Sequence, residues 1–127
     1  MAKARKPTHP KTLARRCAEL ALTKKAKDVV MLDIRPLTDM SDFFVVCHGD
    51  NDTQVRAIAD AIVDGATKLG IKPYRTEGWQ GLQWVILDFV EVVVHVFYKE
   101  TREFYKIERL WADAKVEQVV DELEIPE

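Results

Sequence analysis

The sequence predicts a single-domain α/β (α+β) fold, with a central mixed five-stranded sheet flanked by helices. Three observations support this prediction. The chain has 127 residues, which is enough for one hydrophobic core. Its 47% hydrophobic and 31% charged content is typical of a globular protein, and no apolar run is long enough to span a bilayer. Segments of helical and extended periodicity follow one another in the order α-β-β-α-β-β-β-α.

The first ten residues predict a disordered basic tail, because they carry two prolines and no aliphatic run. A folded domain is expected from residue 11 to residue 113. Its first helix is predicted to begin at Thr12 as N-cap, since Leu13, Cys17, Leu20 and Ala21 recur on one helical face.

Two strands and a long helix come next. In residues 27–34, Val29, Met31 and Asp33 alternate with Val30, Leu32 and Ile34 before Pro36. Residues 41–49 contain aromatic and β-branched residues and end at Gly49. Residues 50–70 predict a helix that opens with capping residues and closes at Gly70. Its core side comprises Val55, Ile58, Ala59, Ile62, Ala66 and Leu69.

Three further strands and a last helix complete the prediction. The strands are residues 71–78, 82–89 and 91–99, and the last two form a tight hairpin around Val90 and Glu91. A helix over residues 101–111 would place Phe104, Ile107, Leu110 and Trp111 in the core, with Arg102, Tyr105 and Arg109 on another face. Residues 114–127 predict an acidic tail, either a weak helix or frayed.

Charge is distributed unevenly along the chain. Residues 1–27 hold nine Lys and Arg against Glu19 alone, whereas the remaining residues hold ten against twenty acids. An acidic body argues against a broad phosphate-binding surface and favours a basic partner protein. Cys17 and Cys47 show no zinc-binding spacing, so they predict reduced thiols in a cytosolic-type compartment. We expect Cys47 to be a small buried hydrophobe, on the strand face opposite His48.

Catalytic motifs are missing from the sequence. It contains no GxGxxG, P-loop, HExxH or nucleophile elbow. A nucleotidyltransferase needs paired acids after a Gly-Ser turn, but the matching position after Gly49 is Asp60, with Ile62 two positions on. Two interpretations of His95 stay open: a hydrogen-bonded histidine in a half-buried sheet, or a ligand-binding or catalytic group. Trp84 shares a strand face with Ile86 and Asp88, which predicts an accessible face on the hairpin.

The sequence closely resembles the ribosomal silencing factor family, also called Iojap-like. The matching segments are "LDIRPLTDMSDFFVVCHG", "TQVRAIADAI", "GIKPYRTEG", "WVILDF" and "VVVHVFYKETREFYKIERLW". The resemblance implies a nucleotidyltransferase-like fold without catalytic acids, and a cytoplasmic translational repressor that needs no cofactor or metal. It implies binding to the large ribosomal subunit through large-subunit ribosomal protein fourteen, which blocks joining of the small subunit when nutrients are scarce.

The same resemblance implies a partner-binding surface made of Trp84, Phe89, His95, Arg102 and Tyr105. It also implies a homodimer as one state of the free protein. Two features depart from the family: Val90 and Glu91 stand where many members have Gly-Asp, and the basic N-terminal extension is additional, with a minor contact to ribosomal RNA as its expected role. The alternative from a different class is a residual nucleotidyltransferase or nucleotide-binding enzyme that uses Asp88 and His95.

Overall fold

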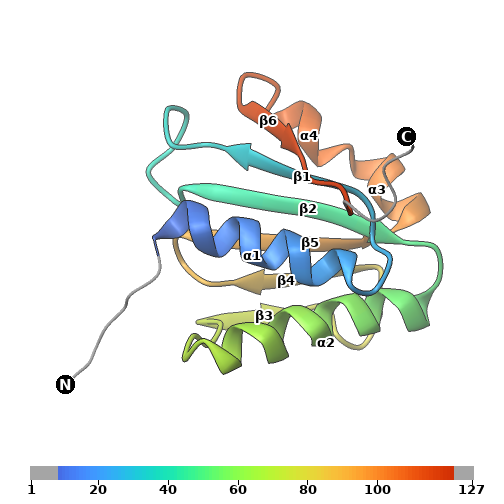
Figure 1. Ribbon diagram of the computed structural model, residues 1–127. Coiled ribbons are helices and arrows are strands. Elements are labelled where there is room, and N and C mark those ends of the chain that lie inside the picture. The colour runs from blue at the N-terminus through green and yellow to red at the C-terminus, as the bar shows by residue number, and fades with distance from the viewer. Residues whose placement is uncertain (1–8, 122–127) are drawn as a thin grey trace, which may run out of the picture.

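A mixed sheet of six strands forms the centre of the fold in the computed structural model, which describes residues 9–121 (Figure 1). The strand order is β3-β4-β5-β2-β1-β6. The elements are α1 Pro10–Leu22, β1 Lys27–Asp33, β2 Phe43–Gly49, α2 Asp52–Lys68, β3 Arg75–Glu77, β4 Trp84–Asp88, β5 Val92–Tyr98, α3 Lys99–Tyr105, α4 Ile107–Leu110 and β6 Lys115–Gln118. Within the described residues, no helix is long and apolar enough to cross a membrane.

The middle of the sheet is a parallel pair, β2 and β5, while every other neighbouring pair is antiparallel. The register of the parallel pair runs from Phe43 opposite Val92 to Gly49 opposite Tyr98. Most residues of these two strands are buried, because both faces of the sheet centre are covered. This double burial explains why both segments are almost continuously apolar in sequence.

Helices α1 and α2 lie side by side against one face of the sheet (Figure 1). The five predicted apolar positions within α2, from Val55 to Ala66, are fully buried there. Leu69, predicted for the same side, lies just beyond the last residue of α2 and is exposed, so that part of the prediction was wrong. Asn51 caps α2 by accepting a hydrogen bond from the backbone N–H of Gln54 at 2.8 Å. The predicted N-cap of α1 was wrong: the helix begins at Pro10 after His9, because proline suits the first helical position.

Two thiols lie within the core under these helices. Cys17 and Cys47 are both buried and free, and burial raises the pKa of each thiol to about 12. The prediction of Cys47 as a small buried hydrophobe is therefore confirmed. Cys47 faces the helices, whereas His48 lies on the other side of the sheet, where it contacts Arg102.

The predicted helix over residues 101–111 is two short helices instead. Lys106 adopts a left-handed conformation, with φ of 48°, and its backbone N–H bonds to the carbonyl of Arg102 at the end of α3. This break rotates α4 relative to α3, so the predicted core set is divided. Ile107 is buried and Trp111 is half-buried, but Phe104 and Leu110 are exposed.

The sixth strand corrects the prediction of five strands. Residues 115–118, expected within the acidic tail, form β6 and pair antiparallel with β1, from Val30 opposite Gln118 to Asp33 opposite Lys115. Glu117 of β6 also forms an ion pair with Arg15 of α1. Backbone hydrogen bonding to the open edge of β1 holds this strand, although all four of its residues are exposed. The last residues of that tail, 122–127, and residues 1–8 of the basic tail lie outside the described residues.

The hairpin between β4 and β5 contains a strained turn at Val90. The N–H of Glu91 bonds to the carbonyl of Phe89 at 3.0 Å across Val90, whose φ is 76°. This is a γ-turn with a positive central φ, a rare and strained conformation for a β-branched residue. Two side chains hold it in place, because Ser41 donates to the Val90 carbonyl and Asp88 accepts from the Val90 N–H.

Candidate functional site

An aromatic patch lies where α3 meets the start of β4. We define the aromatic patch as Trp84, Phe104 and Tyr105. The ring of Tyr105 lies 5.1 Å from that of Trp84 and 5.0 Å from that of Phe104, between ring centroids. Phe104 is 78% exposed and Tyr105 is 52% exposed. A cluster of exposed aromatic rings held by a rigid sheet is typical of a protein-binding surface.

Trp84 connects this patch to the sheet below it. Its ring stacks on Phe97 of β5 with 4.8 Å between centroids, and its indole N–H donates to Nδ1 of His95 at 3.1 Å. The predicted alternation of β4 is confirmed, since Val85 and Leu87 are buried under the helices while Trp84, Ile86 and Asp88 are only partly buried. Packing on one side and a hydrogen bond on the other fix the orientation of the indole.

His95 lies buried beside Trp84, in a neutral state. Burial lowers the pKa of its imidazole to about 4, with a weaker opposing effect from the carboxylate of Asp88. Because Nδ1 accepts a hydrogen bond from the indole N–H of Trp84, the proton of the neutral imidazole is on Nε2. Nε2 is buried and has no hydrogen-bond partner in the structure. The interpretation of His95 as a hydrogen-bonded histidine of the sheet therefore holds for Nδ1, which has a partner, but not for Nε2, which has none.

Two predicted surface residues lie elsewhere. Phe89 is buried in the cluster under α1 and α2, on the sheet face opposite the aromatic patch. Arg102 is only 8% exposed, so the prediction that it projects from an accessible face was wrong. The structure brings Trp84, His95 and Tyr105 together and places Phe89 and Arg102 apart from them.

Arg102 lines a polar cleft together with residues of β1, β2 and α4. Its guanidinium donates to the carbonyls of Asp28 at 2.8 Å and Lys27 at 3.4 Å, to Nδ1 of His48 at 3.0 Å, and to the carboxylate of Glu108 at 2.6 Å. These partners come from β1, β2 and α4, so one side chain ties α3 to the sheet and to the next helix. Burial and the positive charge of Arg102 lower the pKa of His48.

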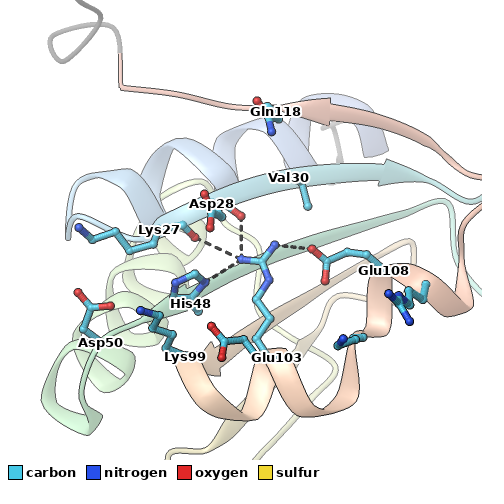
Figure 2. A pocket seen from close by; sticks show the side chains of 12 residues that line it. Lys27, Asp28, Val30, His48, Asp50, Lys99, Glu103, Glu108 and Gln118 are labelled. Carbon is cyan, nitrogen blue, oxygen red and sulfur yellow. Dashed lines mark hydrogen bonds and ion pairs between the residues drawn. The ribbon is translucent and has the colours of Figure 1, made fainter.

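Charges of both signs surround Arg102 in this cleft of about 1070 Å³. Figure 2 shows Lys27 and Lys99 beside Asp50 and Glu103, with Glu108 on the other side of the guanidinium. Because the lysines and carboxylates are interspersed, the cleft presents no uniform field to an anion or a cation. We attribute to Arg102 a structural role, which positions α3 and with it Tyr105.

An apolar groove lies on the same sheet face, next to His95. It has a volume of about 370 Å³. We call this pocket the apolar groove. Its lining residues are Ile34, Thr38, Met40, Ser41, Phe44, Tyr74, Arg75, Ile86, Asp88, Val90, Val93, His95 and Trp111. The ring of Phe44 meets that of His95 edge-on at 4.7 Å and that of Trp111 at 5.3 Å. The groove meets the aromatic patch where Trp84 of the patch donates its hydrogen bond to His95 of the groove.

Sequence reasoning missed Phe104 and the apolar groove. Helical periodicity assigned Phe104 to the core, and only the left-handed Lys106 reveals otherwise. The groove combines the loop at residues 38–41, β2, Tyr74 and the hairpin of β4 and β5, which are distant from one another in sequence, so no local pattern marks it. Among residues 9–121, no group of three or more His, Cys, Asp or Glu side chains is placed to hold a metal ion.

Comparisons with known proteins agree on one family. Residues 7–127 match the family model described as ribosomal silencing factor during starvation. A ribosomal silencing factor of Bacillus subtilis is 44% identical over 91 residues, which cover 72% of this chain and 77% of that protein. A mouse protein named mitochondrial assembly of ribosomal large subunit protein 1 is 30% identical over 91 residues, 69% of this chain and 40% of the relative. A crystal structure of a Chromobacterium violaceum protein superposes with a TM-score of 0.81 at 29% identity, over 92% of this chain and 98% of that one.

Proposed function

The chain belongs to the ribosomal silencing factor family, and on this premise we propose that it represses translation by binding the large ribosomal subunit. The names of its relatives support an association with the ribosome: one is a silencing factor, and another is named for assembly of the large subunit. Nutrient limitation is the condition in which we expect this repression, and the cytoplasm is the expected place.

The observation that carries the proposal is the aromatic patch. Tyr and Trp dominate the energetics of protein interfaces, and here they lie on α3 and β4 within 5.1 Å of each other. Because Trp84 is fixed by Phe97 and His95, its ring is already oriented before a partner arrives. Pre-organisation of this kind reduces the entropy lost on binding.

We further propose large-subunit ribosomal protein fourteen as the direct partner. Residues 28–127 carry ten Lys and Arg against twenty acids, so electrostatics favour a basic protein such as those on ribosomal surfaces. The mechanism is then steric: a bound copy occupies the surface on which the small subunit docks. Occupancy alone is sufficient, so the proposed activity is binding without catalysis.

The nucleotidyltransferase alternative invoked Asp88 and His95, and their contacts favour structural roles. Asp88 accepts from the Val90 backbone at 2.7 Å and from the guanidinium of Arg75 at 3.2 Å. His95 accepts from Trp84. We therefore do not advance this alternative.

Two secondary parts of the proposal concern the tail and self-association. The basic N-terminal segment is expected to add a minor contact to ribosomal RNA, since Lys and Arg bind phosphates. We also propose that the free protein forms a homodimer. Deletion of residues 1–10 followed by a binding assay tests the first, and analytical ultracentrifugation tests the second.

Sedimentation through a sucrose gradient tests the main proposal. The purified protein is mixed with large ribosomal subunits, first alone and then with small subunits added. We expect it to migrate with the large subunit and to reduce the peak of joined ribosomes in proportion to its occupancy. Failure to migrate with large subunits would disprove the proposal, whereas full joining with the protein still bound would disprove only the steric mechanism. Pull-down of isolated protein fourteen identifies the direct contact.

A further inference from the structure

Large, exposed hydrophobic side chains line the rim of the apolar groove. Met40 is 83% exposed and Tyr74 is 77% exposed, and both line the groove together with Val90 at the strained turn. The floor consists of Phe44, Ile86, Val93 and His95 from three neighbouring strands. Exposed apolar side chains gathered around a concavity indicate a binding site more strongly than the same residues scattered singly.

His95 supplies an independent sign that the groove takes a ligand. Its Nε2–H is a hydrogen-bond donor, because Nδ1 already accepts from Trp84. The donor is buried and unpartnered, and a buried polar group without a partner is unfavourable in the free protein. A donor kept in this state in the floor of the groove is explained if a bound partner supplies the missing acceptor.

The charges around the groove restrict the chemistry of that partner. Arg75 is paired with Asp88 at 3.2 Å and with Glu77 at 3.3 Å, so the cation at the rim is already neutralised. The carboxylate of Asp88 disfavours an anionic occupant, and the neutral ring of His95 cannot compensate a negative charge. An uncharged acceptor such as a carbonyl oxygen fits this environment, whereas a carboxylate or a phosphate does not.

We propose that the apolar groove receives an apolar, uncharged segment of the ribosomal protein partner, with a carbonyl oxygen of that segment accepting a hydrogen bond from Nε2 of His95. This inference rests on the proposed function. The groove adjoins the aromatic patch through the bond between Trp84 and His95, so one partner surface can cover both. Because Nε2 is buried in the free protein, binding includes a rotamer change of the side chains over it, a common adjustment at interfaces.

Charged substitutions at the rim test the groove without disturbing the core. Met40→Glu and Tyr74→Glu place a carboxylate in the groove at well-exposed positions. Each is expected to weaken co-sedimentation with large ribosomal subunits about tenfold or more. Leu69→Glu is the matched control, since Leu69 is an exposed apolar residue at the end of α2 and does not line the groove. It should bind like the wild type.

Two substitutions of His95 test the donor itself. His95→Phe keeps a ring of similar size but removes both the Nε2–H donor and the Nδ1 acceptor of the Trp84 indole, and we expect about tenfold weaker binding. His95→Gln reaches the position of Nε2 with an amide N–H and should retain most of the affinity. Equal affinities of the wild type and His95→Phe, with both folded by circular dichroism, would overturn the role of Nε2.

The full set of variants separates the two proposals. If wild-type protein does not bind large subunits, the proposed function fails. If wild type binds and Tyr105→Ala weakens binding, but both rim variants bind normally, the groove proposal alone is overturned. If Met40→Glu instead abolishes self-association of the free protein in the ultracentrifuge and leaves subunit binding intact, a second copy is the occupant, which also overturns it.

Discussion

The indole N–H of Trp84 donates a hydrogen bond to Nδ1 of His95 across neighbouring antiparallel strands, at 3.1 Å. This bond fixes the half-buried indole of the aromatic patch and leaves the proton of His95, a residue of the apolar groove, on Nε2. One contact therefore determines the chemistry of two adjacent surfaces. The proposed binding face depends on it.

Truncation of the aromatic patch should weaken binding to the large subunit. Tyr105→Ala and Trp84→Ala are each expected to reduce the binding free energy by about 2 kcal/mol, or roughly thirtyfold in affinity. Phe104→Ala should have a smaller effect. The ring of Phe104 packs on Tyr105, whereas Tyr105 also packs on Trp84 and so lies at the centre of the patch. Leu69→Ala serves as the control, and circular dichroism verifies folding. Unchanged co-sedimentation of both Tyr105→Ala and Trp84→Ala would refute the interface assignment.

Acid should destabilise the protein through His95. Its pKa falls from 6.5 in the unfolded chain to about 4 in the fold, so the unfolded state binds more protons between these pH values. The stabilisation is fully present above pH 6.5 and is lost progressively as the pH falls towards 4, by about 3 kcal/mol in total for this group. His48, whose pKa is also lowered, acts in the same direction.

Urea denaturation at a series of pH values measures this loss. The His95→Phe variant removes the titrating group, so its stability should change less between pH 6.5 and pH 4 than that of the wild type. Parallel pH profiles for the two proteins would show that the acid sensitivity has another origin.

Removal of the Arg102 guanidinium should detach α3 from the sheet. Arg102→Ala eliminates four hydrogen-bonding contacts and leaves the carboxylate of Glu108 without its partner, so we expect a loss of about 3 kcal/mol in the free energy of unfolding. Arg102→Lys retains the charge without the planar fork and should recover only part of the loss. The control is Arg109→Ala, an exposed residue of α4 for which a change within about 0.5 kcal/mol is expected. Equal midpoints for Arg102→Ala and Arg109→Ala in urea would contradict the anchoring role.

Relief of the strained turn should stabilise the protein. Val90→Gly removes the steric penalty of a β-branched residue at φ of 76°, and after the entropy of glycine is subtracted we expect a net gain of about 1 kcal/mol. Val116→Gly is the matched control in extended strand β6, where glycine should be neutral or destabilising. Chemical denaturation of both variants decides the question. A lower midpoint for Val90→Gly would mean that contacts of the Val90 side chain outweigh the backbone strain.

Much of the fold was predictable because its signals are local. Helix α2 displays five apolar residues at helical spacing and all five are buried, while β4 alternates as expected between a covered and a half-covered face. Strand β6 was not predictable. Its four residues are exposed, so no side-chain pattern distinguishes them from a tail, and only the free backbone groups of β1 define them as a strand.

The candidate site was predictable in part for a related reason. Strand and helix periodicity place Trp84 and Tyr105 on accessible faces, and the resemblance to the family places them on one surface. Their rings lie 5.1 Å apart. Burial of Arg102 depends on carbonyls at Lys27 and Asp28, which are more than seventy positions away. Exposure of Phe104 depends on the left-handed Lys106, and a lysine carries none of the sequence signals that glycine or asparagine would give.

The parallel pairing of β2 with β5 has a consequence for how quickly the protein becomes active after synthesis. Val46 lies opposite His95, so the two central strands are about 50 positions apart in the chain and cannot pair until the hairpin that completes β5 has left the ribosome. Such non-local contacts slow folding, because a long loop must close before any of them forms. Every element of the aromatic patch is attached to this late-forming half. A growing chain therefore cannot bind through the patch until nearly its whole length has been translated.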